Sequence, residues 1–196
     1  MSDSSPSEHL SSKSVPLHDR ASLLRELERM GIAAETIEHE AVATVAEANA
    51  THHALSGVHT KNLFVKDKKS RVFLVVVPAE ARVDLKRLHS AIGAQGRLSF
   101  GRPEQLWALL GVRPGSVTAF GAINDREGTV TVVLDEAVAS AERVCAHPLE
   151  NTATTAVSAD DLLRFLREEE HEPIVVDVPR AEDTQVEGTQ DTPSGG

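Results

Sequence analysis

The chain has 196 residues, a formal net charge of −10 at pH 7 and a single cysteine, Cys145. This length is typical of one domain, and one cysteine excludes both an internal disulfide and a cysteine-based zinc site. Because the thiol content fits a reducing compartment and no apolar run reaches about 18 residues, we expect a cytoplasmic protein without a membrane span.

The two ends of the chain differ in composition from its middle. Residues 1–17 are rich in serine, and residues 179–196 combine Gly, Pro and Thr with acidic residues. Such segments bury too little apolar surface to offset the entropy of ordering. We therefore predict a disordered N-terminal tail over 1–17, one folded domain over 18–178 and a disordered acidic tail over 179–196.

The first half of the domain contains clear helix and hairpin signals. Asp19 is placed to cap a helix that ends at Gly31, and Thr44 with Glu47 has the spacing of a capping box. Two apolar runs around a polar turn predict a hairpin. The expected elements are helices over 20–30 and 44–54, a strand over 36–39, and hairpin strands over 63–65 and 72–77.

The second half alternates helices with short strands. Asp84, Pro103 and Ser158 are each placed to begin a helix. The expected elements are helices over 84–92 and 103–110 and from 158 onwards, and strands over 97–100, 129–134, 144–146, 153–157 and 174–178. Because several strands follow one another without a helix, we predict an α/β fold of α+β-like character. Its single domain would hold a mixed, strongly twisted central sheet or partial barrel flanked by helices.

Positive charge is concentrated in one region of this acidic chain. Residues 61–102 contain ten of the twenty Lys and Arg residues and three acids, which gives a local charge of +7. Most charge runs are solvated faces without further meaning. This concentration nevertheless favours a surface that faces a polyanion.

Lys61 lies where the first hairpin strand becomes apolar, between Thr60 and Asn62. A lysine at the edge of a strand is usually exposed and without function. A partly desolvated lysine can instead hold a phosphate or carbonyl oxygen as a compact charge with three donors. The setting makes Lys61 our first candidate for chemistry.

Two further segments are candidates for a small polar pocket. His147 precedes Pro148, which favours an extended backbone, and short polar side chains follow it from Asn151. A lone histidine is more often packed than functional, although such groups would suit an ammonium or a carbonyl. The loop over 111–121 could bring backbone N–H groups to an anion, but its Gly and Pro residues also mark ordinary turns.

The sequence offers neither a conventional nucleophile nor a metal site. His52, His53 and His59 lack an acidic partner at ligand spacing, so we expect no metal and no cofactor. No GxSxG elbow is present. Cys145 lies in an apolar strand, where a buried thiol is inert by default.

Three segments resemble the YbaK/ProX family of tRNA-editing deacylases. They are His59-Thr-Lys-Asn-Leu-Phe-Val-Lys-Asp-Lys-Lys69, Gly111-Val-Arg-Pro-Gly-Ser-Val-Thr118 and His147-Pro-Leu-Glu-Asn-Thr-Ala-Thr-Thr155. The resemblance covers roughly residues 20–178 and is closest to the freestanding ProXp-ala type. It implies a trans-editing enzyme that hydrolyses the ester of alanine mischarged onto proline tRNA.

The same resemblance implies roles for individual residues. Lys61 takes the place of the essential lysine of the family. The implied substrate-binding residues are Thr60, Asn62, Gly111, Pro114, Gly115, Ser116, His147 and Asn151. The chain departs from the family at Ala119, where the family loop often has a proline.

The implied partners are the acceptor stem and CCA end of tRNA, with prolyl-tRNA synthetase as a further partner and no membrane. Phosphate contacts would come from Lys66, Lys68, Lys69, Arg71, Lys86, Arg87, Arg97 and Arg102. A ribose hydroxyl of the substrate would assist the attacking water. Lys61 would either anchor the terminal nucleotide or polarise the ester, and both roles stay open here.

Two alternatives remain beside the alanine reading. The chain could clear another small aminoacyl group, serine or cysteine, or it could be a non-catalytic module of the same fold that binds tRNA or a synthetase. A synthetase pocket built for proline cannot strongly reject smaller alanine, so an editing site sorts by admitting small side chains.

Overall fold

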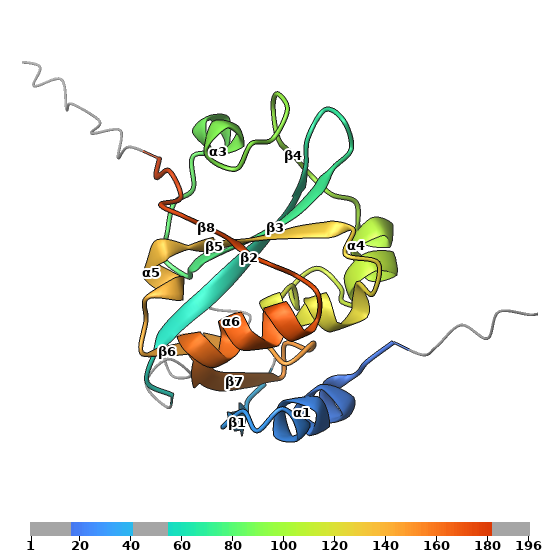
Figure 1. Cartoon of the computed structure of the whole chain (residues 1–196), viewed down its shortest axis with the longest axis vertical. Helices are drawn as coiled ribbons and strands as arrows, with labels where there is room; N and C mark the ends of the chain where they lie inside the picture. The colour runs from blue at the N-terminus through green and yellow to red at the C-terminus, as the bar shows by residue number, and fades with distance from the viewer. Residues whose placement is uncertain (1–16, 41–54, 182–196) are drawn as a thin grey trace, which may run out of the picture.

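The computed structural model describes residues 17–40 and 55–181, and these form one mixed sheet flanked by helices (Figure 1). The sheet is open and has the strand order β1-β7-β6-β2-β3-β5-β8, with β4 also paired to β2. The β2–β6, β3–β5 and β5–β8 pairs are parallel, and the other pairs are antiparallel. The predicted mixed α/β class is confirmed.

The strands in the described part of the chain are β1 (Glu35–Glu38), β2 (Val58–Lys66), β3 (Val72–Pro78), β4 (Ser99–Phe100), β5 (Val130–Asp135), β6 (Arg143–Ala146), β7 (Ala153–Ser158) and β8 (Ile174–Val176). The predicted strands all occur, with shifted ends. The largest shift is in β2, which begins five residues before the predicted start at 63. Its first residues carry polar side chains, which gave no apolar signal.

The helices are α1 (Arg20–Arg29), α3 (Leu85–Ala91), α4 (Pro103–Leu110), a 3₁₀ helix η1 (Ala119–Asn124), α5 (Glu136–Ala139) and α6 (Ala159–Glu168). The Asp19 carboxylate accepts a hydrogen bond from the Ser22 amide, and Asp84 and Ser158 cap α3 and α6 in the same way. The sequence did not predict η1 or α5. The expected helix over 44–54 lies outside the described residues.

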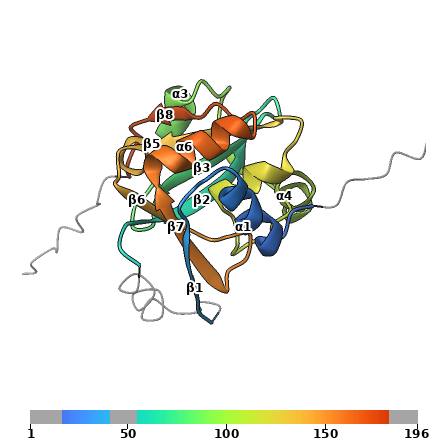
Figure 2. The same cartoon turned by 60° about the horizontal axis from the view of Figure 1, so that its bottom comes forward.

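Apolar side chains form two large cores on the two faces of the sheet, and a third, small cluster contains Leu55, Cys145 and Ala156. The main core receives Leu74 and Val76 of β3 together with α1, α4, η1 and α6, and α6 crosses this face (Figures 1 and 2). The second core receives Val75 and Val77 and lies under α3. Because both faces of β3 are covered, every residue of that strand is buried, which explains its unbroken apolar run.

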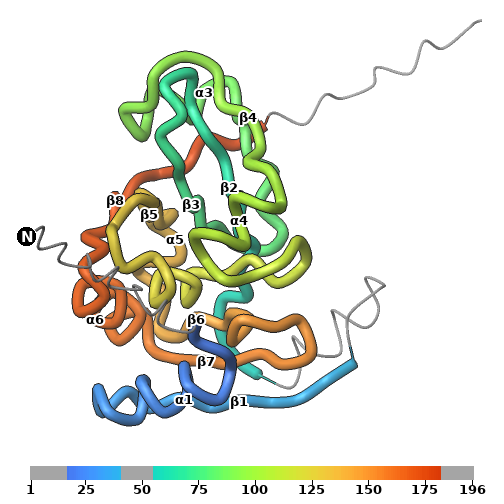
Figure 3. Tube along the Cα trace, turned by 90° about the vertical axis from the view of Figure 1, so that its right-hand side faces the viewer, coloured from blue at the N-terminus to red at the C-terminus, as the bar shows by residue number. Residues whose placement is uncertain are grey.

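The hairpin of β2 and β3 reaches the same end of the molecule as α3, whereas α1, β1 and β7 lie at the opposite end (Figure 3). Along the sheet, β2 and β3 therefore connect the basic region of the sequence to the rest of the fold. No helix in the ranges 17–40 and 55–181 is long and apolar enough to cross a membrane.

Residues 179–181 correct the predicted start of the C-terminal tail. The amide of Asp84 donates to the carbonyl of Pro179 at 2.8 Å, and the amide of Ala181 donates to that of Arg82 at 2.7 Å. The Arg180 guanidinium lies 2.9 Å from the buried carboxylate of Asp135. The folded domain therefore extends at least to residue 181, because these contacts join its end to α3 and β5.

Candidate functional site

The sheet is interrupted along one edge of β2. On that edge β2 pairs with β6 at His59 and with β4 at Val65. Within the described residues, no strand covers the stretch between these two pairings. The other edge is continuously paired with β3. Because the His59 carbonyl accepts from the Ala79 amide on the β3 side, alternation turns the backbone groups of residues 60 and 62 towards the open edge.

A cavity of about 210 Å³ lies at this interruption. Its lining combines residues from all three motifs that resemble the editing family: Thr60, Lys61, Asn62, Gly115, Val117 and His147. Larger hollows of about 660 and 490 Å³ lie beside α3 and α1. Volume alone would select those two, but the small cavity is the one that brings the three motifs together.

Asn62 provides an acceptor without a donor. Its Nδ2 donates to the Val117 carbonyl at 2.9 Å, and because a carbonyl can only accept, this contact fixes the orientation of the amide. Its Oδ1 is then buried without a hydrogen-bond partner in the described part of the chain. Leaving such an acceptor unpaired is costly, so a donor of a bound molecule would be stabilised here once the side chain is uncovered.

His147 provides a second acceptor. Its Nδ1 lies 3.0 Å from the carbonyl of Ala153 and therefore donates, which leaves Nε2 of the neutral ring as an acceptor. Burial lowers the pKa of His147 below its usual value of 6.5. Positive charge on His39 lowers it further, against the opposing effect of the Ala153 hydrogen bond. The imidazole is therefore neutral at pH 7.

His39, which the sequence did not single out, lies beside His147. The two ring centres are 6.2 Å apart, and His39 Nε2 lies 2.9 Å from the Thr154 hydroxyl. The neighbouring Thr155 hydroxyl lies 2.8 Å from that of Thr36. Thr154 and Thr155 are among the short polar side chains that follow Asn151, which the sequence suggested for a pocket, and they instead connect β1 and His39 to β7. His39 reaches the site through this pairing, which joins segments more than 100 residues apart.

Lys61 reaches the cavity from the other face of the sheet. Strand alternation places Thr60 and Asn62 on the face of the main core and Lys61 on the face of α3. The Thr60 hydroxyl donates to the carbonyl of Cys145 at 3.1 Å. Lys61 is partly buried, and its side chain has no hydrogen bond or ion pair with a described residue. Its ammonium is therefore available to an incoming oxygen.

The loop over 111–121 supplies one wall of the cavity. Gly115 has φ 93° and lines the cavity, and Asn151 Nδ2 lies 3.8 Å from where a Cβ on Gly115 would stand. Gly111 ends α4 with φ 64°, and a Cβ there would lie 2.6 Å from Asn124 Nδ2. Gly111 therefore shapes the loop from outside the cavity.

Two other predicted loop residues, Pro114 and Ser116, belong to a turn that is closed by a hydrogen bond from the Ser116 amide to the Arg113 carbonyl. Neither lines the cavity. Val117 lines the cavity, although the sequence did not indicate it. Its contact with Asn62 is made by its backbone carbonyl, which any residue could supply.

Cys145 is excluded as a nucleophile by its surroundings. Its side chain is buried in β6, and its sulfur lies 3.7 Å from the carbonyl of Ser56. Burial raises the pKa of the thiol to about 11. Because the thiolate is the reactive form, Cys145 is inert at neutral pH, as the sequence predicted.

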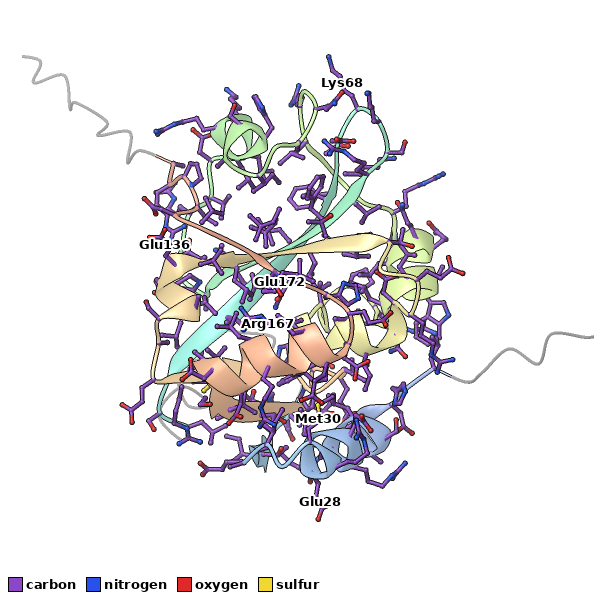
Figure 4. The ribbon with its side chains drawn as sticks, viewed as in Figure 1. Glu28, Met30, Lys68, Glu136, Arg167 and Glu172 are labelled. Atoms are coloured by element: carbon purple, nitrogen blue, oxygen red, sulfur yellow. The ribbon has the colours of Figure 1, made fainter. Side chains whose placement is uncertain are left out.

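The candidate RNA-binding residues lie in or next to α3, β4 and the hairpin of β2 and β3, except Arg102, which directly precedes α4. Figure 4 labels Lys68 at the hairpin end of the molecule. Lys86, Arg87 and Arg97 line the hollow of about 660 Å³, which we call the basic cleft, together with Val83, Asp84, Leu85, Leu98 and Ala181. Seven of the eight candidates have no ion pair with a described residue: Lys66, Lys68, Lys69, Lys86, Arg87, Arg97 and Arg102.

Arg71, the eighth candidate, is exposed, but its guanidinium is occupied by contacts within the fold. Its Nε donates to the buried Asp67 carboxylate at 2.9 Å, and its Nη2 donates to the Gly93 carbonyl at 2.8 Å. Burial would raise the pKa of Asp67, but hydrogen bonds from the Gln95 amide, from Arg71 and from the Lys69 amide lower it to about 2. Arg71 and Asp67 thus fasten the hairpin tip to the loop over 93–95.

Of the three histidines considered for a metal site, His52 and His53 lie outside the described residues, and His59 is the second residue of β2. In the part of the chain that the structure describes, no three His, Cys, Asp or Glu side chains are grouped so that they could hold a metal ion.

Comparison with known proteins gives consistent matches. The family model described as "Aminoacyl-tRNA editing domain" matches residues 39–165. The chain is similar to "Prolyl-tRNA synthetase associated domain-containing protein 1" of Danio rerio, with 40% identity over 83% of this chain and 89% of that protein. It is also similar to "Prolyl-tRNA editing protein ProX" of Acetoanaerobium sticklandii, with 32% identity over 76% of this chain and 90% of that protein.

A solved structure supports the fold. The crystal structure of a candidate trans-editing enzyme for prolyl tRNA synthetase superposes with a TM-score of 0.64 and 22% identity, and covers 85% of this chain and all of that one. The family model spans more than half of the chain, and both curated relatives exceed 30% identity. The chain therefore belongs to the aminoacyl-tRNA editing domain family, a family of editing enzymes, as its three motifs predicted.

Proposed function

We propose that the chain is a trans-editing deacylase that hydrolyses alanine from mischarged proline tRNA in the cytoplasm. The observation that carries the proposal is the cavity at the open edge of β2. There Lys61, whose ammonium has no partner among the described residues, lines one cavity with Asn62 and His147, whose Oδ1 and Nε2 have no described donor. The names of the relatives, which refer to prolyl-tRNA editing and to prolyl-tRNA synthetase, support the choice of RNA.

The two acceptors fit the amino group of an aminoacyl ester. A protonated α-amino group is a donor without acceptor capacity, so it pairs with Asn62 Oδ1 and His147 Nε2. The Lys61 ammonium would repel that amino group and therefore binds an oxygen, either the ester carbonyl or a phosphate. This division of donors and acceptors gives the aminoacyl group one orientation in the cavity.

The reaction needs little more than positioning and charge. Water adds to the ester carbonyl carbon, the bond from that carbon to the ribose oxygen breaks, and the ribose oxygen takes a proton. The products are free alanine and uncharged tRNA. Because the ester is already activated, orientation of the reactants and stabilisation of the developing oxyanion can supply the acceleration. The neighbouring ribose hydroxyl orients the water.

The size of the cavity supports a small aminoacyl group. Its volume of about 210 Å³ is below the range of roughly 300–1,000 Å³ that is usual for drug-sized ligands. A cavity of this size sorts substrates by excluding larger side chains. Serine and cysteine are close to alanine in size, so their esters are the competing substrates to test.

The first experiment is deacylation of alanyl-tRNA(Pro) by the unchanged protein and by Lys61→Ala. We expect the unchanged protein to release alanine from the tRNA rapidly. The deacylation rate of the variant should be at least about 100-fold lower, which is the usual effect of removing an oxyanion donor. Arg25→Ala, on the exposed face of α1, is the control and should retain the rate, because Arg25 belongs neither to the cavity nor to the candidate RNA-binding residues. An effect on kcat assigns Lys61 to the ester, and one on KM alone assigns it to the nucleotide.

Prolyl-tRNA(Pro) and seryl-tRNA are the substrate controls. Hydrolysis of the serine ester in preference to alanine would replace the alanine reading with the nearest alternative. Binding of RNA without hydrolysis of any ester would instead favour a non-catalytic module. Association with prolyl-tRNA synthetase, which the names of the relatives suggest, is tested by co-purification of the two proteins.

A further inference from the structure

Phe100 is exposed although every other phenylalanine is buried. Its exposed fraction is 62%, whereas that of the other four phenylalanines does not exceed 5%: Phe64, Phe73, Phe120 and Phe165. Single exposed apolar residues are common on protein surfaces. The position of this one, relative to the cavity and the basic cleft, is what makes it informative.

The backbone holds Phe100 in place where side-chain burial does not. Phe100 pairs with Val65 of β2, and the Gly101 amide donates to the Phe64 carbonyl at 2.9 Å. A Cβ at Gly101 would lie 2.3 Å from the Phe64 ring, so no other residue fits without a shift. The Phe100 ring is thus presented to solvent from a fixed strand, and ordering it on binding costs little entropy.

Phe100 and Lys61 lie on the same face of the sheet. Directly paired residues of antiparallel strands share a face, so Phe100 lies on the face of Val65. Alternation along β2 puts Leu63 and Lys61 on that face as well. Val65 lies four residue steps along the strand from Lys61, which is a distance of about 13 Å. Phe100 therefore borders the open edge of β2 at the end opposite to β6.

The basic cleft begins next to Phe100. Arg97 and Leu98, which precede β4, line it together with Lys86 and Arg87 of α3. The three cations have no ion pair with residues of the described ranges. Asp84, the one acid in its lining, already accepts hydrogen bonds from the first amides of α3. An occupant of this surface must therefore combine negative charge with a flat apolar group.

We propose that Phe100 stacks on an unpaired base of the RNA, directly before the esterified nucleotide, while the basic cleft holds the adjoining phosphates. This inference rests on the proposed function for the identity of the RNA. An aromatic ring can stack on the face of any base. The negative phosphates of a nucleic-acid backbone can pair with the three cations of the basic cleft. A strand with unpaired bases fits because bases inside a duplex cannot reach the ring.

The test measures binding of uncharged tRNA(Pro), with its CCA end and after removal of that end, at one fixed salt concentration. Phe100→Ala should weaken binding of the intact RNA by about 5- to 150-fold, the usual effect of losing one stacked base, and leave the trimmed RNA unaffected. Phe100→Trp should retain binding. Val175→Ala, which removes an apolar side chain of 45% exposure on β8, is the matched control and should bind like the unchanged protein.

Because the RNA is uncharged, the result does not depend on hydrolysis. Equal binding of the intact RNA by Phe100→Ala and by the unchanged protein would overturn the inference, as would equal losses for both RNAs or failure of the unchanged protein to bind. If alanyl-tRNA is nevertheless hydrolysed, the proposed function stands without the stacking site. A loss confined to the intact RNA, without hydrolysis of any ester, supports the stacking site while the proposed function fails.

Discussion

His147 shows how the fold sets the state of a single residue. Burial and the charge of His39 lower the pKa of His147, so the ring becomes half-protonated only at a pH below 6.5. An NMR titration of the His147 ring should therefore give a midpoint below 6.5. A midpoint at or above 6.5 would contradict the burial that the structure shows.

His39 allows the two causes to be separated. Because its charge lowers the pKa of His147, His39→Gln should move the His147 midpoint upward, while burial keeps it below 6.5. His89→Gln, on α3 at the far end of the molecule, is the matched control and should leave the midpoint unchanged. If both variants behave alike, the effect of His39 is not electrostatic.

At the scale of elements, the β2–β3 hairpin depends on Asp67. The pKa of this carboxyl is lowered from 3.8 to about 2, so the ionised form stabilises the folded state above pH 4, and this contribution is lost as the pH falls from about 4 to about 2. Asp67→Asn should lower the urea midpoint of unfolding at pH 7. The difference from the unchanged protein should shrink over that acidic range.

Glu28→Gln is the control for this experiment. Glu28 is exposed on α1, at the end of the molecule opposite to the hairpin tip (Figure 4). Removal of its charge should leave the urea midpoint nearly unchanged at both pH values. A constant gap between Asp67→Asn and the unchanged protein from pH 7 to pH 2 would refute the role of the ionised carboxylate.

The elements also show what the sequence could predict. Caps and apolar spacing are local, so the helices that begin after Asp19, Asp84 and Ser158 were found close to their true bounds. The pairing of β2 with β6 and with β4 joins distant segments, and no local pattern encodes it. The open edge of β2, and with it the cavity, could not be predicted.

Some residues of the candidate site could be predicted from the sequence and others could not. The resemblance to a known family indicated Lys61, Asn62 and His147, and the structure places all three at one cavity. It did not indicate Val117, which acts through its backbone, or His39, which depends on the pairing of β1 with β7. Side-chain identity is visible in a sequence, whereas a carbonyl group or a distant neighbour is not.

At the scale of the whole molecule, the last described residues fasten α3 to β5. We predict that deletion of residues 1–16 and 182–196 leaves the melting temperature unchanged. Further deletion of 179–181 should cost about 1–3 kcal/mol, because it removes the partner of the buried Asp135 carboxylate, although the exposure of Arg180 reduces the loss. For a domain of this size, each kcal/mol lowers Tm by about 2–4 °C.

Thermal unfolding of the two truncated chains tests this boundary. Arg180→Gln in the full chain is the matched variant, since it removes the ion pair and keeps the backbone contacts of residues 179 and 181. It should lower Tm by less than the longer truncation does. A large drop in Tm after the shorter truncation would show that the removed segments contribute to the fold.

The interrupted edge of β2 also bears on how this protein could diversify. The lysine stands on a strand that is fastened to three others, so its position is as rigid as the sheet itself. The opposite wall is a loop over 111–118 that meets this strand through one hydrogen bond to a carbonyl. Substitutions in that loop can change the space available to the side chain of a bound molecule without changing the position of β2. If the proposed function holds, discrimination between amino acids and the chemistry of hydrolysis can therefore evolve on separate parts of the chain.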